Sequence, residues 1–266
     1  MRFYYGYDVC SQEPAFRALS HKLDSYVAGI ELAWMMQKIS YRRHRYPPHI
    51  IQHAVWLYAR FTLSFRDVED LLTERGLEIS YETVRRWFLK FGTPIAKNLR
   101  SSRPIPNDYW HLDEMVIVIR GKQHWLWRAV DNEGEVLDFL VQPRRNAKAA
   151  LKLIRKLLKK QGVLPTRIVT DKLRSYHVAF RTIGLTAEHV DDKRSNNRAE
   201  NSHQLVRRRE RKMQRYKSPG SVQRFLNIQS ATYNSFYIQR HLFNRTTFKQ
   251  HRTVAFDVWK QATAAV

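Results

Sequence analysis

Apolar residues recur at helical spacing between residues 48 and 92, and this pattern predicts three short helices. The stripe of the first helix is formed by Ile50, Ile51, Ala54, Val55 and Tyr58. Ser64 and Ser80 precede the second and third helices, and serine favours the N-cap position. Two short helices joined by a tight turn are typical of a helix-turn-helix, the arrangement that places its last helix against DNA.

The pattern changes to strands after residue 108, where long β-branched and aromatic runs are separated by turn residues. The expected strands are 109–119, 124–131, 135–142, 166–171 and 187–192, and the expected helices are 146–162, 174–183, the segment with Glu200, and 221–238. Three consecutive strands followed by alternating helices and strands predict an α/β domain of RNase H-like order. Such a domain has a mixed five-stranded sheet with flanking helices.

These patterns divide the chain into five parts. They are an N-terminal extension (1–39), an all-α helix-turn-helix domain (40–100), a linker (101–107), the RNase H-like domain (108–240) and a C-terminal tail (241–266). The extension lacks the dense basic character of the rest. Two interpretations stay open for it: translation begins at Met35 or Met36, or the extension packs on the body.

Charge narrows the class of partner. The chain of 266 residues carries 47 lysines and arginines against 24 acids, a net charge of +23. Such an excess favours a polyanion, with nucleic acid ahead of a membrane surface. The single cysteine, Cys10, excludes an internal disulfide framework and a cysteine-based zinc finger. No apolar run approaches the roughly 20 residues of a membrane span, so we expect a soluble, cytoplasmic protein.

Three acids are candidate catalytic residues and metal ligands. Asp113 lies inside an otherwise apolar strand, where a carboxylate needs a positive partner, either a metal ion or an arginine. Asp171 ends the fourth strand, which in this topology lies beside the first, although turn aspartates are common. Glu200 begins a helix, where it either faces the sheet or forms a capping box with Asn197.

Converging carboxylates suit Mg²⁺, with Mn²⁺ as an alternative. Two such ions, about 3.5–4 Å apart, activate a water or a 3′-hydroxyl for in-line displacement at phosphorus. Other acids compete for these roles: Glu114, Asp131, Asp191 and Asp192.

Two groups of side chains are candidate DNA contacts. The first lies on the outer face of the third helix: Tyr81, Thr83, Arg85, Arg86 and Lys90. The second accompanies the acids: Lys172, His203, Arg207, Arg208, Arg211 and Lys212. The alternatives are the charged outer face of any helical bundle and, for His203, a packed histidine that contacts no DNA.

Five sequence blocks occur in the order seen in one known family. They are "FRDVEDLLTERGLEISYETVRRW", "WHLDEMVIVIRGKQHWLWRAVDNEGEVLDF", "RRNAKAALKLIRKLL", "VTDKLRSY" and "NNRAENSHQLVRRRERKMQRYKSPGS". Together they resemble the DDE transposases of bacterial insertion sequences, with insertion-sequence family six the nearest group, over roughly residues 41 to 240. The family's acids fall on Asp113 in "HLDE", Asp171 in "TDK" and Glu200 in "NNRAE".

The resemblance implies an activity. A helix-turn-helix binds the terminal inverted repeats of a mobile element, and an Mg²⁺-dependent domain cuts the ends and transfers the 3′-hydroxyl into target DNA. Joining two ends predicts a homodimer or larger assembly on double-stranded DNA. The loop after residue 183 is shorter than the family pattern, and residues 1–39 have no counterpart in it. The competing hypotheses are a catalytically silent, transposase-derived DNA-binding repressor and a plain RNase H-type nuclease.

Overall fold

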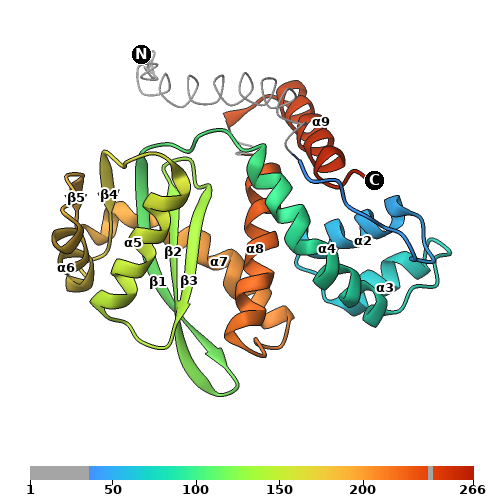
Figure 1. The fold of residues 1–266 in the computed structure, drawn as a ribbon, viewed down its shortest axis with the longest axis horizontal. Helices are drawn as coiled ribbons and strands as arrows, with labels where there is room; N and C mark the ends of the chain where they lie inside the picture. Colours follow the sequence, from blue (N-terminus) through green and yellow to red (C-terminus); the bar gives the residue numbers. More distant parts are fainter. Residues whose placement is uncertain (1–35, 239–241) are drawn as a thin grey trace, which may run out of the picture.

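The computed structural model describes residues 36–238 and 242–266, with residues 193 and 194 described by their backbone alone (Figure 1). The two interpretations of the N-terminal extension concern residues that lie mostly outside this range. None of the described helices combines the length and apolar character needed to cross a bilayer.

Three helices form the N-terminal part: α2 (Pro48–Arg60), α3 (Phe65–Thr73) and α4 (Tyr81–Ser101). Ser64 and Asp67 make a reciprocal capping box at the start of α3, and the Ser80 side chain accepts a hydrogen bond from the Thr83 amide at the start of α4. The third helix is longer than the sequence pattern predicted, because it continues beyond Gly92 and through Pro94.

Packing against α8 (Pro219–Phe236) explains this continuation. Gly92 lies so close to α8 that an added Cβ would stand 3.3 Å from a methyl group of Ile228. The missing side chain therefore permits close helix packing, and the buried residues Ile95 and Leu99 extend that contact beyond the proline.

The remaining elements form the sheet and its helices. They are β1 (Tyr109–Ile119), β2 (Lys122–Asp131), β3 (Val136–Gln142), α5 (Ala147–Gln161), β4 (Arg167–Val169), α6 (Arg174–Ile183), β5 (Glu188–Val190), η3 (Lys193–Asn196), α7 (Asn197–Lys212) and α9 (Arg245–Ala262). The strand order is β3-β2-β1-β4-β5. The first three strands are antiparallel, whereas β1, β4 and β5 are parallel. The predicted fold class is confirmed: a mixed five-stranded RNase H-like sheet preceded by helices.

Two apolar cores enclose this sheet. On one face, α5 and α6 pack over Trp110, Leu112 and Trp127. On the other face, Met115 and Ile117 belong to a core that continues through α8 into the N-terminal helices. Figure 1 shows α8 between the sheet and α2, α3 and α4. Because the helical part and the sheet share one core, they are held as one packed body.

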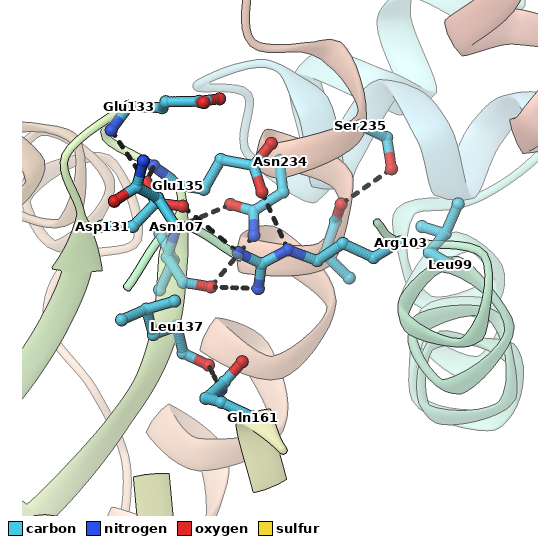
Figure 2. A network of polar contacts seen from close by, with 12 residues as sticks. Leu99, Arg103, Asn107, Asp131, Glu133, Glu135, Leu137, Gln161, Asn234 and Ser235 are labelled. Carbon is cyan, nitrogen blue, oxygen red and sulfur yellow. Dashed lines mark hydrogen bonds and ion pairs between the residues drawn. The ribbon is translucent and has the colours of Figure 1, made fainter. Parts of the chain in front are cut away.

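Polar contacts attach the linker to the same body. Figure 2 shows Arg103 beside the β2–β3 turn and α8. Its Nε donates to Glu135 at 2.8 Å, and its guanidinium lies 3.7 Å from Asp131. Asn234 of α8 exchanges two hydrogen bonds with the backbone of Val136, both 2.9 Å long. Residues 241–266, which we expected to form a tail, contain α9, which packs on α4 and α8.

Candidate active site

Alternation along β1 places two neighbouring acids on opposite faces of the sheet. Asp113 faces α7, where its carboxylate lies 3.3 Å from Nδ1 of His203. Glu114 faces α6 and is buried, and it accepts a hydrogen bond of 3.0 Å from the Tyr176 hydroxyl. Two consecutive residues of β1 therefore present one carboxylate to each face of the sheet.

Parallel pairing of β1 and β4 brings Asp171 to the same edge. One carboxylate oxygen from each of Asp113, Glu114 and Asp171 can be chosen so that all three lie within 4.8 Å of one another. The predicted approach of Asp113 and Asp171 therefore occurs in the structure. Glu114, which the sequence marked only as a competitor, joins them.

Glu200 reaches the same cleft from α7. This cleft has a volume of about 420 Å³ and is lined by Asp113, Arg145, Asp171, Lys172, Leu173 and Glu200. The Glu200 side chain is exposed and stands outside the set of three close carboxylates. The structure thus places the three predicted acids around one cleft, with Glu200 at its rim.

The start of α7 is fixed by a contact with β1. The N-cap residue is Asn196, whose side chain makes no capping bond and instead donates to the Leu112 carbonyl at 2.8 Å. The capping-box interpretation with Asn197 is therefore wrong, because the helix begins one residue earlier than that box requires. The contact with Leu112 holds the first turn, and with it Glu200, beside Asp113.

Arg145 is a positive group of the cleft beside Lys172, and the sequence pattern did not mark it as a site residue. Its Nε donates to Glu114 at 2.7 Å, and its terminal nitrogen lies 3.2 Å from Asp171. Its guanidinium also stacks over Trp125 at 5.1 Å. The only sequence signal was its place in "RRNA", just before α5.

Burial makes Glu114 a weaker acid than a solvent-exposed glutamate. Desolvation raises its pKa to about 7, the negative charge of Asp171 acts in the same direction, and Arg145 opposes both. A protonated Glu114 donates or accepts a hydrogen bond without adding a negative charge to the cleft. Asp113 and Asp171 are the carboxylates that are at least partly exposed to the cleft.

His203 is buried against Asp113 and does not contact Glu200. The structure also places the other competitors away from the cleft. Asp131 is buried in the β2–β3 turn, and Asp191 lies 3.2 Å from His177. Asp192 accepts a hydrogen bond from Ser195.

The candidate DNA contacts separate into free and engaged side chains. Along α7, Arg207, Arg208 and Arg211 are exposed. Lys212 is paired with Asp67 at 2.7 Å. On α4, Nε and one terminal nitrogen of Arg85 each donate to Glu82 at 2.8 Å. Arg86 is 75% exposed, and its Nε also lies 3.5 Å from Glu82. Lys90 lies 2.8 Å from His44, and the Thr83 and Ser80 hydroxyls lie 3.0 Å apart. The Arg66 guanidinium covers the Tyr81 ring at 4.6 Å.

Residues 107–237 match a family model described as a DDE domain. The chain is also 30% identical over 179 residues to the transposase for insertion sequence-like element IS431mec of Staphylococcus aureus, over 65% of this chain and 80% of that protein. The chain belongs to the DDE transposases of bacterial insertion sequences. It is 29% identical to the transposase for element IS257 in transposon Tn4003 of Staphylococcus aureus, over 65% of this chain and 80% of that protein.

The transposase also has a distant structural likeness. It is similar to the HTLV-2 integrase catalytic core domain solved in complex with magnesium, at 13% identity and a TM-score of 0.38. The match covers 53% of this chain and 92% of that one.

A DDE domain implies a divalent metal ion, and the donor set of the transposase fits one. Carboxylate oxygens are the ligands that Mg²⁺ and Mn²⁺ prefer. Asp113 and Asp171 could supply them together with Glu114, and Glu200 lines the same cleft. Arg145 partly compensates the same negative charge, so a cation and this guanidinium compete for Asp171.

Proposed function

We propose that this transposase binds the terminal inverted repeats of its element, cuts the strands at those ends and transfers the 3′-hydroxyl into target DNA. The observation that carries the proposal is the single cleft lined by Asp113, Asp171 and Glu200, with exposed arginines of α7 beside it. Asp113, Asp171 and Glu200 would hold Mg²⁺, with two ions expected in the full site. The bound metal would supply activation of a water or 3′-hydroxyl and stabilisation of the leaving oxygen.

The chain's own residues prepare this chemistry. His203 holds one Asp113 oxygen, so the carboxylate keeps a defined orientation toward the cleft. Arg145 orients Asp171 and Lys172 lines the cleft, so each presents positive charge near the position of a scissile phosphate. Arg207 and Arg208 lie further along α7, where they bind phosphates of the DNA backbone.

The helical part supplies recognition in this proposal. Arg86 and Lys90 of α4 are exposed and contact duplex DNA at the repeat, together with Thr83. Transfer of two ends to one target requires two active sites, so the transposase acts as a homodimer or a larger assembly on DNA.

The test compares acid variants on a duplex that carries the element end and its flank. Asp113→Asn, Asp171→Asn and Glu200→Gln abolish Mg²⁺-dependent cleavage and strand transfer and retain binding of the end. Asp191→Asn is the matched control, because this carboxylate is exposed and lies outside the cleft. Full transposition by any of the three variants excludes that acid as a ligand.

The repressor hypothesis has one supporting observation, the contact of Arg145 with both Glu114 and Asp171, which neutralises the cleft in the absence of metal. Wild-type protein that binds the end tightly and never cuts it in Mg²⁺ or Mn²⁺ supports the repressor instead of the enzyme.

A further inference from the structure

A second hollow lies away from the acids, between the first turns of α4 and the turn that follows α7. We name it the α4–α7 groove. It has a volume of about 750 Å³ and is lined by residues of α3, α4, α7 and α8. Nothing in the proposed cleavage chemistry uses it.

The groove is strongly basic. No aspartate or glutamate is among its lining residues, and two of its cations, Arg85 and Lys212, are paired with acids outside it. Five further lining cations have no ion pair to any acid of the described chain: Arg66, Arg211, Arg215, Lys217 and Arg224. Uncompensated positive charge at this density fits a chain of phosphates.

Apolar and planar side chains line the same groove. Tyr81 and Leu89 of α4 are 37% and 44% exposed and line the groove together with its cations. The Arg66 guanidinium lies over the Tyr81 ring at 4.6 Å. Aromatic rings and arginine planes are the surfaces on which unpaired nucleobases stack.

The turn at the groove's edge is strained. Gln214 and Arg215 have φ values of 51° and 72°, the left-handed region that residues other than glycine seldom occupy. Both residues, with Arg211, also line a smaller cleft of about 320 Å³ beside Arg207. Exposed basic side chains therefore continue along α7 from Arg207 to the groove, with Glu210 as the acid that also lines the smaller cleft.

We propose that the α4–α7 groove binds a single DNA strand, with its phosphates on the unpaired cations and one unpaired base on Tyr81. The inference rests on the proposed function, since strand cleavage at an element end creates a strand terminus that can separate from its complement near α7. The groove volume lies within the range of small-ligand pockets, about 300–1,000 Å³, which is far below the bulk of a duplex. Arg86 and Lys90 lie outside the groove and remain predicted duplex contacts.

The experiment measures binding of a fluorescent 12-nucleotide oligo-dT and of its duplex with oligo-dA, by anisotropy without divalent metal. Tyr81→Ala weakens binding of the single strand about fivefold or more, because stacking on an aromatic ring contributes at least that factor per base. Tyr81→Phe keeps the ring and binds as the wild type does.

The charged side of the groove has its own variant. Arg215→Gln reduces the slope of log K against log salt for the single strand by about 0.7, the value for one lost phosphate contact. Lys159→Gln is the matched control, because Lys159 is exposed on α5 and remote from the groove. It leaves both affinity and slope unchanged.

Two results overturn the inference. One is a Tyr81→Ala affinity for the single strand within twofold of wild type. The other is an equal loss for duplex and single strand, which assigns the groove to duplex DNA. Since binding is measured without metal, its outcome is separate from catalysis. If the variants show these single-strand effects but the wild-type protein never cuts DNA, the proposed function is disproved and the groove site stands.

Discussion

Arg209 attaches α7 to the N-terminal helices, and replacing it tests that connection. This side chain of α7 is only 2% exposed. It donates to the Leu63 carbonyl at 2.8 Å and to the carbonyls of Tyr58 and Phe61 at the end of α2. Its guanidinium also lies over the rings of Tyr58 at 4.4 Å and Phe225 at 5.0 Å. Arg209→Met keeps an unbranched apolar side chain and removes every polar contact.

The expected loss follows from these contacts. The bond to the Tyr58 carbonyl is buried, and a buried carbonyl that loses its donor costs about 1–3 kcal/mol. The bonds to Phe61 and Leu63 are partly buried, so their loss adds a smaller cost. The opposing effect is the desolvation of the guanidinium, which lowers the pKa of Arg209 and disappears in the methionine variant. We expect a net destabilisation of about 3 kcal/mol. For a chain of this size, that lowers the melting temperature by about 6–12 °C.

Thermal unfolding followed by near-ultraviolet circular dichroism measures this shift. Arg208→Met is the matched control, because the neighbouring arginine is exposed and its replacement should change stability by less than about 0.5 kcal/mol. A melting temperature of Arg209→Met within about 2 °C of the control refutes the claim that this arginine joins the two parts.

Three further predictions follow from other contacts. Arg145→Met removes the guanidinium that competes for the cleft carboxylates, so Mn²⁺ should bind several-fold tighter by calorimetry, and weaker binding contradicts the competition. Burial and the charge of Glu135 raise the pKa of Asp131, so the folded state holds a proton that the unfolded state has lost above about pH 4. Stability therefore falls as pH rises toward neutral, and Asp131→Asn should reduce that fall in melting temperature; an unchanged slope excludes Asp131 as its source. Gly92→Leu should cost about 1–3 kcal/mol in urea unfolding because it overpacks against Ile228, and Gly92→Leu combined with Ile228→Ala should recover part of the loss.

The sequence by itself determined the local elements and the edge at which the acids meet. Alternation placed Asp113 in a strand buried on both faces, and the order of strands and helices put Asp171 on the neighbouring strand. Serine caps at residues 64 and 80 marked two helix starts correctly. These features depend on neighbours in the chain or on the few topologies that such an order permits, so a pattern of residues is sufficient to predict them.

Only the tertiary structure decided which charged groups are buried and what they contact. Arg209 stands in a row of basic residues and looks like its exposed neighbours, yet its partners on α2 lie about 150 positions earlier in the chain. Arg145 and Glu114 likewise meet across separate elements. Helix α4 continues through Pro94 because α8 packs against it. Burial and pairing are set by residues distant in sequence, and a local pattern carries no record of them.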